Sequence, residues 1–415
     1  MAIRKIRVKN FKSFRDLEVE LGNFNVLIGA NASGKSNFVQ IFKFLRDIMI
    51  SGLENAVSMS GDIEYLRNLN IRSSNNIKIE VNIDTDFGIL LKETVESLFG
   101  FNAKESIYEF ALKMLNNDYK IDEEKLNQKC EFVKLTPKKD LKGNIIGKGT
   151  IDIIRKNGNL DVELKGAENV PITKQDIIPT SYKKKELSNK NLFIKEPILP
   201  SFLLRRFFED ISIYNFDPNL PKKATPITGK AELEEDGNNL SIIIKNIISD
   251  PKSNRKIINL IKDVLDFVVD IGVEKFADKQ LLMKFCETYN KNQYLPAFLM
   301  SDGTINITSL IIALYFEKKQ VTIIEEPERN IHPYLISKVI EMMKDASRNK
   351  QIIISTHNPE IVKYAGIDNI LLVSRDKDGF STITRPANKN EIKEFLKNEI
   401  GIDQLFVDRL LEVYN

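Results

Sequence analysis

The eight residues from Gly29 to Ser36 match the pattern G-x-x-x-x-G-K-[ST], a spacing suited to binding phosphate. The glycines let backbone N–H groups turn toward phosphate oxygens, and a helix beginning near Gly34 would point its positive end at the same anion. Lys35 would neutralise the β- and γ-phosphates of ATP, and the Ser36 hydroxyl would ligate Mg²⁺. We therefore predict a nucleotide site formed by Gly29, Asn31, Ser33, Gly34, Lys35, Ser36 and Asn37.

Two neighbouring carboxylates, Glu325 and Glu326, follow the apolar run from Val321 to Ile324. The run is typical of a strand, and α/β sheets bind ligands at the carboxyl ends of their strands. Glu325 would hold the hydration shell of Mg²⁺, and Glu326 would orient or deprotonate an attacking water. A solvated loop is the alternative for such a pair. The phosphate-binding pattern elsewhere in the chain favours the catalytic interpretation.

The run Ser301-Asp302-Gly303-Thr304 precedes an apolar stretch, Ile307 to Phe316, with the spacing of a helix. A serine and a glycine ahead of a helix can form an anion-binding N-terminus, so Ser301 and Gly303 are candidate nucleotide ligands. An ordinary helix N-cap is the alternative.

The two histidines, His332 and His357, lie in predicted loops beside these motifs. His357 follows the predicted strand from Gln351 to Ile354, where it could contact the γ-phosphate or the attacking water. Either histidine could instead belong to the core. We take Lys35, Glu326 and His357 as the candidate catalytic residues.

The residues around these motifs predict an α/β core. Glycine and turn residues separate short apolar runs, and one run with helical spacing, Gly34 to Met49, follows the phosphate-binding loop. Continuous apolar runs of the kind found in buried central strands cover Phe24–Ile28, Val321–Ile324 and Gln351–Ser355. Other predicted strands are Ile3–Val8, Leu17–Leu21, Ile77–Ile83, Val268–Phe276 and Leu281–Cys286, with a closing hairpin at Leu371–Ser374 and Ser381–Thr384 and a helical tail from Asn390.

The stretch from 85 to 266 differs in character, and we interpret it as an insertion of helical and β-hairpin elements that could serve as a partner or dimerisation surface. Leu90 to Leu115 looks helical, and Lys134 to Lys148 is polar and rich in lysine. Asn157-Gly158-Asn159 is a turn signal between two hairpin strands, Thr150–Arg155 and Leu160–Leu164. The predicted domains are therefore 1–84, 85–266 and 267–415. Without sustained heptads, a long coiled-coil arm is not expected.

The composition is that of a soluble globular protein, with 42% hydrophobic and 29% charged residues in a chain of 415. A formal net charge of +3 neither requires nor excludes nucleic acid. The two cysteines, Cys130 and Cys286, give no disulfide framework, and no apolar segment is long enough to span a bilayer. We expect a cytoplasmic protein without a signal peptide.

Taken together, these motifs resemble the ABC-type ATPase heads of the RecF, SMC and OLD-like group, and most closely the bacterial AAA-family ATPases with an S-D-G-T signature. The resemblance rests on Ile6–Phe14, Gly34–Asn37, Ser301–Thr304, Glu325–Pro333 and Ser355–Pro359, which anchor about half of the chain. It implies a mixed-sheet ATPase head with flanking helices, interrupted by the insertion. Departures are Glu325, where many ABC ATPases have aspartate, and the absence of an identifiable Q-loop glutamine.

The resemblance also implies a dimer that sandwiches two ATP molecules with Mg²⁺. Ser301 and Gly303 of one subunit would close on the γ-phosphate held by Lys35 of the other. Residues Asn330 to His332 would cross the interface, His357 would be the switch histidine, and Lys12 would add a phosphate contact.

Three functions remain open. The first is an ATPase that regulates a separate nuclease or toxin in bacterial anti-phage defence, because residues 359–415 are too few for a C-terminal nuclease domain. The second is DNA maintenance, with phosphate contacts from lysines 134, 138, 139, 142, 148 and 183 to 185, although a solvated loop also explains these lysines. The third is a nucleotide-gated scaffold with little turnover. A transporter subunit is disfavoured by the S-D-G-T signature.

Overall fold

The chain folds into two compact units. A computed structural model describes residues 1–407 except 72–74, 95–96, 116–117, 136–142, 157, 167–169, 179–181, 183–186, 277–278, 291–292 and 389–401. The first unit comprises Met1–Gly22, Ser36–Ile211 and Ser374–Ile383, and the second Asn23–Lys35, Ser212–Val373 and Thr384–Asn415. Both units contain part of the segment 85–266, and its role as a distinct insertion stays a prediction. No described helix has the length and apolar character needed to cross a membrane.

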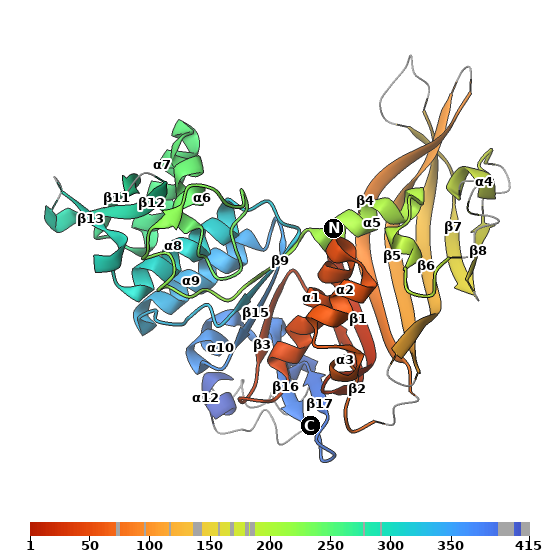
Figure 1. The fold of residues 1–415 in the computed structure, drawn as a ribbon, viewed down its shortest axis with the longest axis horizontal. Helices are drawn as coiled ribbons and strands as arrows, with labels where there is room; N and C mark the ends of the chain where they lie inside the picture. Colours follow the sequence, from red (N-terminus) through yellow and green to blue (C-terminus); the bar gives the residue numbers. More distant parts are fainter. Residues whose placement is uncertain are drawn as a thin grey trace. The chain divides into compact units, whose positions relative to one another are not determined.

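The first unit contains a seven-stranded sheet in which every neighbouring pair is antiparallel. Its long middle strands run side by side in Figure 1. The strand order is β2 (Phe14–Glu20), β1 (Ala2–Phe11), β4 (Ile77–Glu93), β5 (Leu98–Leu115), β6 (Asp118–Leu135), β7 (Asn144–Lys156) and β8 (Asn159–Lys165). The unit also contains α1 (Lys35–Ser51) apart from its first residue, α2 (Leu53–Met59), α3 (Ile63–Leu66), α4 (Lys174–Ile177), η2 (Phe193–Lys195) and α5 (Leu199–Glu209).

One row of buried side chains crosses all seven strands and fixes their register. Each member pairs directly with the next across the sheet, and each is at most 6% exposed. Burying an aliphatic side chain of this size stabilises a fold by about 1.5–3 kcal/mol, and a slip of one residue would turn a strand's members to the opposite face. The row consists of Val19, Ile6, Val81, Tyr108, Leu126, Ile153 and Val162.

The helix predicted for Leu90 to Leu115 is wrong, because this stretch forms the end of β4 and all of β5. In β5 the buried residues first alternate as Phe99, Phe101 and Ala103. A register shift between Ala103 and Glu105 then moves the alternation by one residue, to Ser106 and onward. The bulge breaks the period of two in the sequence, which is why a strand signal was not visible there.

A buried polar cluster ties the segment from Leu187 to Ile194 to this sheet. Glu124 accepts hydrogen bonds from the Tyr108 hydroxyl (2.8 Å) and from the backbone N–H of Phe193 (2.7 Å). The guanidinium of Arg155 lies 3.8 Å from Glu124 and donates to backbone carbonyls of the segment, including Leu187 at 3.0 Å. Burial raises the pKa of Glu124 to about 7, although its hydrogen bonds and Arg155 oppose this shift.

Glu124→Ala should therefore destabilise the protein by about 3–5 kcal/mol, because it leaves the buried Arg155 charge without a carboxylate. Urea unfolding followed by circular dichroism would measure the change. Glu123→Ala, at the neighbouring exposed position of the same strand, should change stability by no more than about 0.5 kcal/mol. Equal effects of the two substitutions would contradict the role assigned to the cluster.

The second unit is built on a parallel sheet. The pairs β16–β3, β3–β15 and β15–β14 are all parallel, and β3, β14 and β15 are almost wholly buried, as their apolar runs predicted. The full strand order of the sheet is β17 (Ser381–Thr384), β16 (Ile370–Arg375), β3 (Phe24–Ile28), β15 (Gln351–Thr356), β14 (Val321–Glu325) and β9 (Ile211–Tyr214). Of these strands, most of β17, the last two residues of β16 and the first residue of β9 are counted in the first unit.

A smaller antiparallel sheet and a set of helices complete the second unit. The small sheet contains β10 (Thr225–Pro226), β12 (Gln280–Glu287), β11 (Val268–Phe276) and β13 (Tyr294–Pro296). The helices are α6 (Leu240–Ile248), α7 (Pro251–Val264), η3 (Thr288–Asn290), η4 (Ala297–Leu299), α8 (Asp302–Tyr315), α9 (Pro333–Ala346), α10 (Pro359–Ala365), η5 (Ile367–Asn369), η6 (Pro386–Asn388) and α12 (Ile402–Val407). The core of the unit brings α6 to α10 together with β3, β14 and β15.

The predicted α/β class, with a sheet core and flanking helices, is confirmed. Every core strand predicted from apolar runs or alternation is present, and β3 has the predicted bounds. The hairpin predicted after Thr150 is also present as β7 and β8. Lys138, Lys139, Lys142, lysines 183 to 185, Asn157 and most of the predicted helical tail lie outside the described residues.

Candidate active site

The loop between β3 and α1 has the backbone that the phosphate-binding pattern requires. Ala32 and Gly34 have φ angles of 61° and 121°, in the left-handed region that favours glycine. Gly29 packs so tightly that a Cβ atom there would lie 2.2 Å from the backbone oxygen of Val373. Ser33 N–H donates to Ala30 O at 3.2 Å and closes the turn. A strand, a tight loop and a helix N-terminus therefore follow one another as predicted.

The ammonium group of Lys35 lies within this loop. Its Nζ donates to the carbonyl oxygens of Gly29 (2.6 Å) and Ala30 (3.0 Å). Partial burial lowers the pKa of Lys35, while the nearby charges of Glu326 and Glu328 act in the opposite direction. Because β3 and β14 both pair in parallel with β15, the loop after β3 and the acidic segment after β14 start from the same edge of the sheet.

Glu326 and His357 contact one another directly at the ends of β14 and β15. The Nδ1 atom of His357 lies 2.9 Å from Glu326 Oε1, and the other carboxylate oxygen accepts a hydrogen bond from Arg329 at 3.0 Å. Partial burial alone would raise the pKa of Glu326, but Arg329 and His357 outweigh it and hold the pKa of this carboxyl below its usual value. The carboxylate is therefore ionised near neutral pH, and an ionised carboxylate accepts hydrogen bonds only, including those from water.

Glu328 is a second, buried carboxylate that sequence reasoning missed. It is 8% exposed, and its Oε1 accepts a hydrogen bond from the Thr356 hydroxyl. Within the described part of the chain its Oε2 is buried and has no hydrogen-bond partner. Burial raises the pKa of Glu328, and the bond from Thr356 offsets only part of this shift. Its presence in the run Glu325-Glu326-Pro327-Glu328 was visible, but its burial depends on tertiary packing.

These side chains surround a cavity of about 330 Å³ in the second unit. Thr356 also accepts a hydrogen bond from Asn358 N–H at 2.9 Å, which shapes the turn that carries His357. The residues that line the cavity are Glu326, Glu328, Arg329, His357, Asn358 and Pro359.

Ser301 and Gly303 stand at the start of α8, where they make local and interloop contacts. Ser301 is the N-cap, and its Oγ accepts a hydrogen bond from Thr304 N–H at 3.1 Å, so the ordinary capping role is present. A Cβ atom at Gly303 would lie 2.6 Å from the backbone oxygen of Asn330, so this glycine allows α8 to pack closely on the loop after β14. Ser301 is nevertheless exposed, and its role in binding nucleotide stays a prediction.

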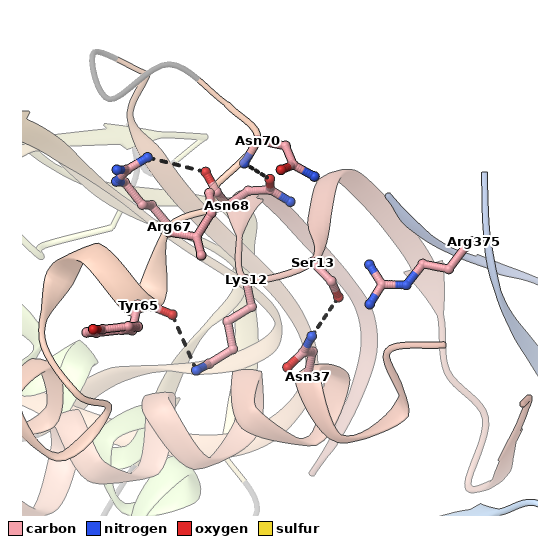
Figure 2. A pocket seen from close by; sticks show the side chains of 9 residues that line it. Lys12, Ser13, Asn37, Tyr65, Arg67, Asn68, Asn70 and Arg375 are labelled. Carbon is pink, nitrogen blue, oxygen red and sulfur yellow. Dashed lines mark hydrogen bonds between the residues drawn. The ribbon is translucent and has the colours of Figure 1, made fainter. Parts of the chain in front are cut away.

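Ser36 and Asn37 follow Lys35 in the first turn of α1. Asn37 donates a hydrogen bond to Ser13 Oγ at 2.8 Å. Asn37 and Ser13 line a pocket of about 340 Å³ in the first unit, shown in Figure 2. Lys12 projects into the same pocket, and burial lowers its pKa. The other lining residues, which the sequence did not single out, are Tyr65, Arg67, Asn68, Leu69, Asn70 and Arg375. Asn31 and Ser36 are exposed, and Glu325 is half-buried at the end of β14.

His332 is an exposed N-cap of α9 and does not belong to the core. Its Nδ1 accepts a hydrogen bond from Tyr334 N–H at 3.4 Å, and the two rings lie 4.9 Å apart. The two candidate histidines therefore differ, because only His357 contacts a candidate catalytic residue.

Together, the parallel sheet, the phosphate-type loop and the adjacent carboxylates define an α/β ATPase. The chain belongs to the AAA ATPase domain family, which it matches over residues 1–362.

Individual relatives are more distant. A protein of Methanocaldococcus jannaschii, "Uncharacterized protein MJECL43", is 24% identical over 160 residues, and the match covers 35% of this chain and 41% of that protein. The chain thus aligns with about two-fifths of this relative's length. Two solved structures are also similar. The SMC head domain from Thermotoga maritima is 12% identical with a TM-score of 0.44, covering 93% of this chain and 99% of that chain. The Smc head domain with an extended coiled coil, bound to the C-terminal domain of ScpA and derived from Pyrococcus furiosus, is 14% identical with a TM-score of 0.49, covering 95% and 99%.

Gly303→Ala should destabilise the protein by about 1–3 kcal/mol, because the added methyl group meets the backbone of Asn330 and the loop must shift. Gly272→Ala on β11 is the matched control, since its Cβ would meet nothing closer than 3.5 Å. Urea titration of both variants would measure the difference. A Gly303→Ala variant as stable as the control would contradict the close packing of α8 on this loop.

Proposed function

We propose that this protein binds ATP at the loop from Gly29 to Ser36 and hydrolyses it with Glu326 as the base. The observation that carries the proposal is the contact between Glu326 and His357 at the sheet edge from which the loop around Lys35 also starts. Lys35 would neutralise phosphate charge, and the amides of the loop would bind phosphate oxygens. Glu326 would take a proton from the attacking water, while His357 would orient Glu326 or contact the γ-phosphate.

The chemistry of the donor set also fits Mg²⁺. No group of three or more His, Cys, Asp or Glu side chains able to hold a metal occurs among the described residues. Mg²⁺ commonly binds through one or two protein oxygens together with substrate phosphates, so Ser36 and Glu325 would be enough protein ligands. When bound, the ion would stabilise negative charge on the phosphates. Glu325, at the end of β14, would orient its water shell, and Lys12 would add a further phosphate contact.

The same proposal extends to a dimer in which each ATP lies between two copies. The exposed position of Ser301 at the N-terminus of α8 supports this, because a helix N-terminus attracts phosphate. Ser301 and Gly303 of one copy would meet the nucleotide held by Lys35 of the other. Asn330 and His332 are exposed, and Tyr334 is 66% exposed, so this surface is available for contact. The Asn330–His332 segment would cross the interface.

Lys35→Ala should lower ATP turnover by at least about 100-fold, and Glu326→Gln by a similar factor while ATP still binds. Glu326→Gln should also accumulate as a dimer with Mg-ATP, because the sandwich closes but does not reopen. Phosphate release and light scattering would measure the two effects. Glu341→Gln on the exposed side of α9 and Lys377→Ala in the turn after β16 are the matched controls. Full turnover by Lys35→Ala would refute the assignment of the loop.

We further propose that the ATP-driven dimer regulates a separate effector, a nuclease or a toxin, in bacterial anti-phage defence. The support is the resemblance of the combined motifs to the S-D-G-T ATPases. DNA maintenance and a nucleotide-gated scaffold are the competing functions. A nucleotide-gated scaffold can be distinguished from a regulator driven by ATP turnover, since the scaffold would stay active in Glu326→Gln.

In a bacterium protected by the native gene and its neighbours, Lys35→Ala should abolish protection, with plaque counts rising to those of an unprotected strain. Lys377→Ala should keep protection. Unaltered resistance in the Lys35→Ala strain would remove ATP from the mechanism. A gene without protective effect, whose product shifts DNA in the presence of ATP, would favour DNA maintenance.

A further inference from the structure

Arg329 connects the catalytic carboxylate to a neighbouring loop. Its Nη2 donates to Glu326 Oε2 at 3.0 Å, and its Nη1 donates to Asn215 Oδ1 at 3.3 Å. His357 engages the other oxygen of Glu326, so both carboxylate oxygens contact side chains of the same chain. Arg329 therefore controls one of the two oxygens with which Glu326 could accept a proton from water.

The backbone of Arg329 is held in turn by the signature helix α8. The Nδ2 of Asn306 donates to the carbonyl oxygen of Arg329 at 2.5 Å. One residue further on, the backbone of Asn330 packs against Gly303. Asn306 is 2% exposed, which fixes the donor within the core. The first turns of α8 therefore hydrogen-bond the carbonyl of Arg329 and pack closely on the carbonyl of Asn330.

Helix α8 and the loop from Glu326 to Asn330 are both suited to transmit movement. All residues of α8 from Thr304 to Leu314 are buried, so the helix is packed along most of its length and would shift as a unit. The loop is short and has left-handed residues at both ends, since φ is 46° at Glu326 and 61° at Asn330. Non-glycine residues keep such backbone angles where the surrounding structure holds them in place. A shift of α8 would act on Arg329 through the hydrogen bond from Asn306 and through the close packing of Gly303 on Asn330.

We propose that Arg329 is a positioning residue that couples the signature helix to Glu326, restraining the carboxylate until Ser301 and Gly303 engage the nucleotide of a second copy. This inference rests on the proposed ATP-sandwich dimer. It adds a path within one subunit, from α8 through Asn306 and Arg329 to Glu326. Through that path, contact with the partner's nucleotide would release the base at the subunit's own site.

A simpler explanation is that Arg329 only stabilises the fold through its ion pair with Glu326. The exposure of the two side chains argues against this explanation. The side chains of Arg329 and Glu326 are 43% and 29% exposed, and pairs this accessible contribute little to stability. Arg348 and Asp345 form another pair three residues apart, at 3.7 Å and with 81% and 56% exposure. Arg348→Ala is therefore a matched control that removes an arginine from a similar pair away from the site.

The test is the ratio of ATP turnover per subunit at high protein concentration, where dimers form, to turnover at low concentration. In Arg329→Ala this ratio should fall at least threefold, because turnover at low concentration rises. Arg329→Lys should keep most of the wild-type ratio, since it retains a cation beside Glu326, and Arg348→Ala should keep all of it. A purely structural role would lower both rates together and leave the ratio unchanged, which would overturn the proposal.

A second readout does not depend on turnover. The protein has only two histidines, so imidazole NMR signals of His357 and His332 can be told apart by Tyr334→Phe or His332→Gln. Without nucleotide, Arg329→Ala should shift the His357 signals and leave those of His332 unchanged. Unmoved His357 signals would refute the contact even in a protein that turns over no ATP. If the wild-type protein turned over ATP no faster than Lys35→Ala, that result would contradict the proposed ATPase function. It would not bear on the contact between Arg329, Glu326 and His357, which the NMR signals test.

Discussion

The parallel pairing of β3, β15 and β14 is the constraint on which the candidate active site depends. Ile28 pairs with Thr356, and Ser355 pairs with Glu325, so the three strands end at the same edge of the sheet. The loop that begins at Gly29, the carboxylate of Glu326 and the turn that carries His357 all start from that edge. These strands are buried almost along their whole length, so a change of register would disrupt the packing on both of their faces and shift the three motifs relative to one another.

Two glycines, Gly29 and Gly303, allow the loops of the site to pack closely on neighbouring backbone. Gly29 allows the phosphate-type loop to lie against the backbone of Val373, and Gly303 allows α8 to lie against Asn330. Both contacts involve backbone atoms, which cannot move aside as a flexible side chain can. The two glycines of the motifs therefore have structural reasons that are independent of any ligand, and substitutions there change loop positions before they change chemistry.

The sequence predicted those parts of the site in which a short apolar run is followed directly by residues that can bind phosphate or transfer a proton. The loop between β3 and α1 and the strands ending at Glu325 and Thr356 follow from short-range patterns. Arg329 and Glu328 could not be assigned roles in this way. Arg329 acquires its role from Asn306 and Asn215, which are 23 and 114 residues away in the sequence. The long strand β5 was missed for a related reason, because a bulge hides its alternation.

Glu326 and Glu328 lie in environments that shift their pKa values in opposite directions. Glu326 faces Arg329 and His357, and these two groups lower the pKa of its carboxyl and keep it ionised. Glu328 is buried, its pKa is raised, and it binds the hydroxyl of Thr356 beside the histidine turn. Neighbouring titratable groups whose pKa values are pushed apart commonly divide the tasks of an active site. Glu328 thus holds, through Thr356, the turn from which His357 reaches Glu326, and the proposed proton transfer concerns Glu326 alone.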